Sequence, residues 1–209
     1  MNATRRQQPR RLVVKLYQFF HISSAFLYCA LLVRWLVLLP LVSRKYLPGG
    51  IHRFLCCLMV YSAIGNILWW VKMRGLAWSI FNRHNLKNIN LIYLVAILHF
   101  YDDFEHSPVL KNTSYSSFIV GLSFTQMYYH WNRIFKGPSL EPQCSKSLAS
   151  RINAFIMIPL VYLSEFYLLL LNTEIDNYHN GPKTVLFNKF VLVVFIPLCL
   201  HLYKGFLYK

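Results

Sequence analysis

Acidic residues are scarce in this chain. Its 209 residues include seven Asp and Glu against 22 Lys and Arg, which gives a formal net charge of +15. Charged residues of both signs make up only 14%, whereas an ordinary globular domain carries about 25%. With 56% hydrophobic residues, this composition excludes an acidic disordered chain and argues against a conventional soluble enzyme.

Cysteine is also sparse and shows no pairing pattern. The odd count of five and the absence of a CxxC pair exclude a disulfide framework and a zinc knuckle. The sequence further lacks HExxH, multi-histidine box, P-loop, GxSxG and paired-aspartate CDP-alcohol patterns. We therefore expect no cofactor and no metal.

Long apolar runs dominate the rest of the chain. A bilayer core about 30 Å thick needs roughly 20 apolar residues per helix. Four runs reach that length, and two weaker runs are shorter or contain polar groups. We predict an all-α, polytopic transmembrane helical bundle that forms one membrane domain over residues 1–209, with a basic arm at 1–17. The predicted spans are the four long runs at 19–42, 51–71, 152–171 and 185–202 and the two weaker runs at 89–101 and 117–135.

Positive charge predicts the orientation of this bundle. If the amino terminus is cytoplasmic and all six runs cross, fifteen of the 22 bases face the cytoplasm, as cytoplasmic loops should. Five of the seven acids then face the lumen, so both termini are predicted to be cytoplasmic. The bases lie between apolar runs, which favours membrane orientation and contact with anionic lipids over nucleic-acid binding.

A topology with four spans is the alternative to the six-span prediction. In it, residues 89–135 lie on one side of the membrane and both termini still face the cytoplasm. The loop 102–116 separates the two topologies, because it is lumenal only in the six-span version. Asn112 begins an N-glycosylation sequon in that loop, Asn-Thr-Ser.

Three charged residues, Arg34, Glu165 and Lys189, fall inside predicted spans. A charge at the bilayer centre costs at least about 2.5–3.5 kcal/mol on insertion scales, so each should face protein and find a partner. Counted from the span ends, their depths agree within about 5 Å. We expect Glu165 to pair with Lys189 or Arg34 and to fix how the first, fifth and sixth spans pack. Alternatively, the side chain of Lys189 extends so that its amine reaches the membrane–water interface.

The segment whose residues best suit metal binding or catalysis lies at the lumenal end of the third span. It places His99, Asp102, Asp103, Glu105 and His106 within eight residues. Two imidazoles and three carboxylates suit a divalent metal or general acid–base chemistry. A solvated acidic helix end explains the same residues without chemistry. The cluster makes a lumenal lipid-modifying enzyme an alternative function.

A Pro48-Gly49-Gly50 triplet lies between the first two spans. Proline presets φ and glycine reaches positive φ, so the triplet predicts a tight lumenal corner. With its basic neighbours it would form a positive lumenal knob beside the acidic loop 102–105. We expect the knob and this loop to form a docking face for a partner, although the triplet could also merely connect two helices. The basic neighbours are Arg44, Lys45, His52 and Arg53.

Residues 38–55, which contain this triplet, resemble the Keg family of small fungal endoplasmic-reticulum membrane proteins. The resemblance implies a multi-pass reticulum protein that supports β-1,6-glucan synthesis and cell-wall biogenesis without catalysing a reaction. It further implies binding to a glucan-assembly type II membrane protein with a glycoside-hydrolase-like lumenal domain. The multi-span layout is also similar to that of proteins that shape reticulum tubules or nuclear-pore membrane, which gives a second alternative function.

Overall fold

The computed structural model describes residues 3–75, 83–100, 109–135, 147–174 and 182–207. All regular secondary structure in these ranges is helical, which confirms the all-α prediction. Two single π-helical turns are present: η1 follows α3, and η2 lies between α5 and α6. The elements are α1 (Ala3–Arg74), α3 (Arg83–Val95), η1 (Ala96–Phe100), α4 (Thr113–Phe135), α5 (Leu148–Ile152), η2 (Asn153–Met157), α6 (Ile158–Glu174) and α7 (Pro182–Leu207).

Three stretches within these helices are long and apolar enough to cross a membrane. Two belong to α1, the first arm Leu12–Val42 and the second arm Tyr46–Met73, and the third is Leu148–Thr173. The helices Asn85–Leu98 and Leu186–His201 are apolar but shorter. The structure thus contains three candidate membrane-spanning helices, while the count of six spans stays a prediction.

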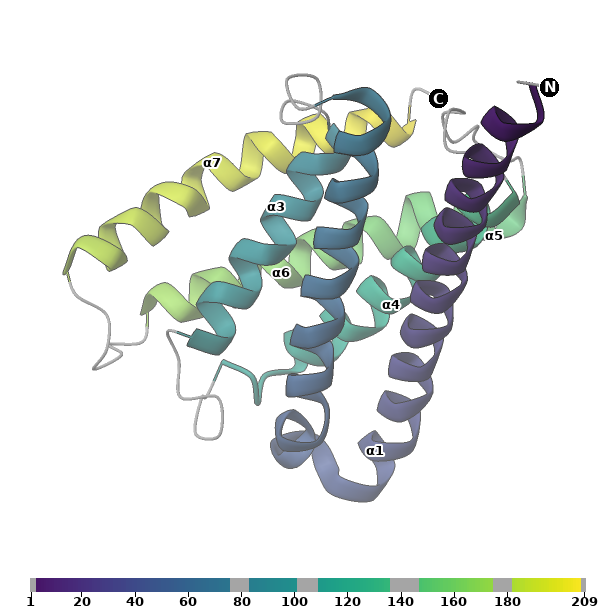
Figure 1. Cartoon of the computed structure of the whole chain (residues 1–209). Helices are drawn as coiled ribbons and strands as arrows, with labels where there is room; N and C mark the ends of the chain where they lie inside the picture. The colour runs from purple at the N-terminus through teal and green to yellow at the C-terminus, as the bar shows by residue number, and fades with distance from the viewer. Residues whose placement is uncertain (1–2, 76–82, 101–108, 136–146, 175–181, 208–209) are drawn as a thin grey trace.

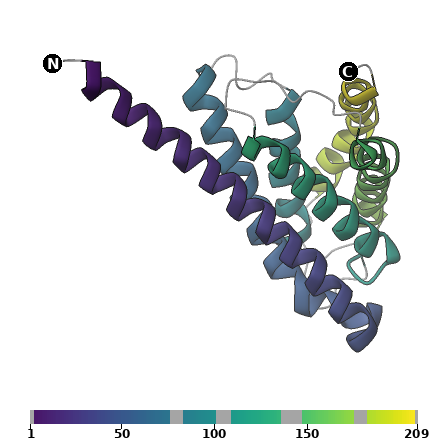
Figure 2. The ribbon, with the colours of Figure 1, turned by 90° about the vertical axis from the view of Figure 1, so that its right-hand side faces the viewer.

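Helix α1 folds back on itself although its helical hydrogen bonding continues throughout (Figure 1). The two arms pack antiparallel: the ring centroids of Tyr17 and Trp69 are 5.3 Å apart, and Ser23 Oγ lies 3.2 Å from Tyr61 Oη. The start of α1 and the end of α7 lie at the same end of the bundle in both views (Figures 1 and 2). An even number of crossings requires that arrangement.

The conformation expected for the corner was wrong. Gly49 and Gly50 are helical, and among the described glycines the positive φ belongs to Gly75, at +83°. The triplet lies inside α1, which stays helical from Ala3 to Arg74. Gly50 serves close packing instead, because a Cβ there would lie 3.0 Å from Leu38 Cδ1.

Alanine substitutions at two glycines test these backbone conformations directly. Gly49 is exposed and helical, and a Cβ there would meet nothing within 4 Å. Gly49→Ala should therefore stabilise the protein by about 0.5–1 kcal/mol. Gly75→Ala should destabilise it by about 1 kcal/mol, because alanine is strained at positive φ. Thermal unfolding in detergent would measure both, and equal destabilisation by the two substitutions would restore the turn interpretation.

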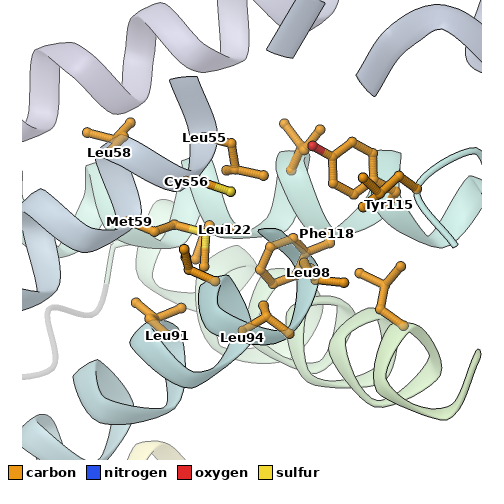
Figure 3. Close-up of a cluster of buried hydrophobic side chains, with 14 of the residues drawn as sticks. Leu55, Cys56, Leu58, Met59, Leu91, Leu94, Leu98, Tyr115, Phe118 and Leu122 are labelled. Carbon is orange, nitrogen blue, oxygen red and sulfur yellow. The ribbon is translucent and has the colours of Figure 1, made fainter. Parts of the chain in front are cut away.

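The core lies where the second arm of α1, α3 and α4 meet (Figure 3). Leu55 and Met59 of α1, Leu94 of α3, and Phe118 and Leu122 of α4 are all at most 2% exposed. In Figure 1, α6 and α7 lie across the bundle and are tilted relative to α1. Polar side chains from several of these helices also lie buried between the helices.

Candidate functional site

Glu165 of α6 is the most deeply buried charged side chain in the described ranges, at 1% exposure. Its carboxylate accepts a short hydrogen bond from Asn90 Nδ2 of α3. Lys87, one helical turn before Asn90, lines the same small cavity. A charged group placed in a membrane interior needs such partners, because lipid offers neither donors nor acceptors.

The expected pairing of Glu165 with Lys189 or Arg34 was therefore wrong. The described residues place Asn90 and Lys87 of α3 against the carboxylate instead. Lys189 and Arg34 are both exposed side chains on the outside of α7 and α1. Equal depth in the membrane did not bring these groups together, because the helices are rotated so that both cations face outward.

The cavity beside Glu165 has a volume of ≈ 20 Å³, which is room for about one water molecule. Thr125 and Tyr162 also line it. The Thr125 Oγ1 atom is buried and lacks a hydrogen-bond partner within the described ranges, so a water there would meet several polar groups. Carboxylate, amide, amine and hydroxyl groups so arranged form a polar joint between α3, α4 and α6.

A second polar cluster joins α1 to α4, and no sequence pattern predicted it. The Nδ1 atoms of His21 and His130 are 2.7 Å apart, so one ring donates and the other accepts. Ser62 Oγ lies 3.2 Å from His130 Nε2. All three side chains are at most 1% exposed. Because 109 residues separate the histidines, no local pattern could have paired them.

In the part of the chain that the structure describes, no group of three or more His, Cys, Asp or Glu side chains could hold an ion. Cys56 also contacts a histidine, with Sγ 3.5 Å from His52 Nε2. The buried histidines contact polar side chains of other helices or of the other arm of α1.

Cations and aromatic rings gather near the ends of α1 and α4. The guanidinium carbon of Arg133 lies 5.6 Å from the ring centroids of both Trp70 and Tyr129. The Lys72 amine lies 5.3 Å above Trp69. Such cation–π contacts suit a membrane boundary, where aromatic rings and bases gather.

The corner of α1 only partly matches the expected docking face. Pro48 is buried, Gly50 is half-buried, and Gly49 is exposed. His52 points inward instead of joining a basic knob: it is 0% exposed, and its Nδ1 lies 3.0 Å from Tyr115 Oη. Arg53 is exposed, so it remains available to a partner.

Several predicted site residues fall outside the described ranges, and the side chain of His99 is also not described. The docking loop and the lipid-modifying alternative therefore stay predictions. Asn112 is described: its Oδ1 accepts a hydrogen bond of 3.2 Å from the Ser114 backbone N–H at the start of α4. Its glycosylation also stays a prediction. The residues outside the ranges are Asp102, Asp103, Glu105 and His106.

The chain is similar along nearly its whole length to a curated protein of Saccharomyces cerevisiae. It is 46% identical over 199 residues to the beta-1,6-glucan synthesis-associated protein KEG1, covering 95% of this chain and 98% of that protein. The chain belongs to the Keg family. The resemblance found in residues 38–55 is thus confirmed. No protein-family model and no solved structure matches the chain.

Proposed function

We propose that this Keg-family protein is a non-catalytic, multi-pass protein of the endoplasmic-reticulum membrane that supports β-1,6-glucan synthesis and cell-wall biogenesis. It does so by binding a glucan-assembly type II membrane protein. The observation that carries this proposal is the 46% identity to a glucan synthesis-associated protein over 95% of the chain. The identity covers nearly all of both chains, so the likeness is not confined to one domain or motif.

We assign the buried polar groups to helix packing, which is consistent with a protein that acts by binding. Glu165 contacts Asn90, and His21 contacts His130, each across two helices. Hydrogen bonds of this kind hold transmembrane helices together. We infer that these contacts maintain a scaffold whose function depends on the surfaces it presents to other membrane proteins.

Complementation tests the proposed function. We expect this chain to restore most of the alkali-extracted β-1,6-glucan in yeast cells depleted of their own KEG1. The matched negative control is the empty vector, and protein abundance is followed by an epitope tag. Normal abundance and correct membrane insertion without any recovery of glucan would contradict the proposal.

The proposed lumenal docking face has its own test at an exposed residue. Replacing the whole Pro48-Gly49-Gly50 triplet would disturb packing, because Pro48 is buried and Gly50 contacts Leu38. We therefore choose Arg53→Glu, which reverses an exposed charge beside the corner. Co-purification with the glucan-assembly protein should fall several-fold. Arg151→Glu is the matched control, since Arg151 is also exposed but lies on α5 and is predicted to face the cytoplasm. Equal capture by both variants would argue against docking at the corner.

A further inference from the structure

The first arm of α1 carries a groove on its outward face. Its lining residues recur at helical spacing and include Phe26, Cys29, Ala30, Val33 and Arg34. The groove has a volume of ≈ 510 Å³ and continues to Leu38. Residues three and four apart share one side of a helix, so these side chains form a continuous stripe. The stripe is apolar except for one charge, that of Arg34.

Arg34 lies deep within the predicted membrane region. It is eight residues before Val42, the end of the first arm, which corresponds to about 12 Å of helix. Its guanidinium carbon lies 5.8 Å from the ring centroid of Phe54, which is eight residues after Tyr46. Because the arms are antiparallel, Arg34 and Phe54 share one depth. The guanidinium therefore stays at that depth and does not extend to the interface.

At this depth Arg34 needs an acceptor. A guanidinium has five N–H donors, and within the described ranges no hydrogen bond or ion pair involves Arg34, whose recorded contact is the ring of Phe54. Glu165, the one acid whose side chain is described, contacts Asn90. Lipid tails supply no acceptor. An acceptor from outside the chain would satisfy the donors.

We propose that this groove binds a transmembrane helix of a partner protein that carries a carboxylate at the depth of Arg34. The inference rests on the proposed function, which already requires a membrane-protein partner, and it names the surface that the partner's helix occupies. The small side chains of Cys29 and Ala30 let two helix backbones approach closely. A carboxylate matches the planar guanidinium with two parallel hydrogen bonds. Phe26 and Val33 flank the small residues and would pack against the incoming helix.

The test uses designed helices and the full-length protein in nanodiscs of zwitterionic lipid. One probe is a Leu/Ala-rich single-pass peptide with one Glu at the depth of Arg34, and the other has Leu at that position. Energy transfer between labelled partners measures binding. The Glu helix should bind about three- to tenfold more tightly. Arg34→Gln should abolish this preference, whereas Lys189→Gln, which removes an exposed charge from α7, should retain it.

Three results would overturn the inference: equal binding of the two helices, an unchanged preference in Arg34→Gln, or displacement of the Glu helix by anionic phospholipid. The last would identify a lipid phosphate as the ligand of Arg34. Co-purification separates this inference from the proposed function. If the glucan-assembly protein is captured equally by wild type and Arg34→Gln, the groove assignment fails alone. If wild type captures none of it yet still prefers the Glu helix, the proposed function fails and the groove stands.

Discussion

Replacing Glu165 with leucine is expected to destabilise the bundle by about 3 kcal/mol. The substitution removes the acceptor of the Asn90 amide and leaves Lys87 in a cavity without its neighbouring carboxylate. A buried donor without an acceptor costs about 1–3 kcal/mol, and more when the group is charged. Thermal or denaturant unfolding in detergent would measure the loss.

Two further variants show whether the lost stability comes from this polar joint. Glu165→Gln keeps an acceptor oxygen for Asn90 and should cost less than Glu165→Leu. Lys87→Met, added to Glu165→Leu, should restore part of the stability, because the cation that the carboxylate accompanied is also removed. A double variant no more stable than the Glu165→Leu protein would show that Lys87 and Glu165 act independently.

Gly65→Val should destabilise the hairpin of α1 by about 2–3 kcal/mol through overpacking. A Cβ at position 65 would lie 2.2 Å from Phe20 Cε2. The Phe20 ring has little room to move, since its centroid lies 5.6 Å from that of Tyr61 and 5.8 Å from that of His130. The two arms would have to separate. Unfolding in detergent, together with cysteine cross-linking between the arms, would measure the effect.

Gly121→Val and Gly49→Val complete this comparison. A Cβ at Gly121 of α4 would lie 2.8 Å from Val161 Cγ2 and 3.4 Å from the backbone oxygen of Met157. Gly121→Val should therefore also destabilise the protein, through the contact of α4 with η2 and α6. Gly49→Val is the matched control, because nothing lies within 4 Å of a Cβ at that exposed position. Similar losses in all three variants would point to valine's helix propensity rather than to packing.

The buried histidines link the packing of the two α1 arms to the packing of α1 against α4. His130 contacts His21 and Ser62 and lies beside Phe20, the ring that a side chain at position 65 would displace. The contact between the two arms and the contact between α1 and α4 therefore share one set of side chains. A disturbance of the hairpin should reach α4 directly, which makes α1 and α4 one packing unit.

The sequence alone was enough to predict the fold class and the family of this protein. The helical, membrane-embedded class follows from apolar runs, because a run about 20 residues long can satisfy its backbone in lipid only as a helix. Gly65 and Gly121 are small residues within predicted spans, and small residues allow helices to approach. Residues 38–55 were enough to indicate the Keg family, and the full-length identity confirms it.

The tertiary structure decided which groups meet. Lys189 and Arg34 matched Glu165 in depth, yet Asn90 and Lys87 occupy its surroundings, because partner choice depends on the rotation and neighbours of each helix. His21 and His130 are 109 residues apart, a distance across which no periodic pattern operates. The corner residues Gly49 and Gly50 are helical, and Gly50 lies close to Leu38. Local composition determines what a segment is, whereas side-chain contacts between segments are set by packing of the whole chain.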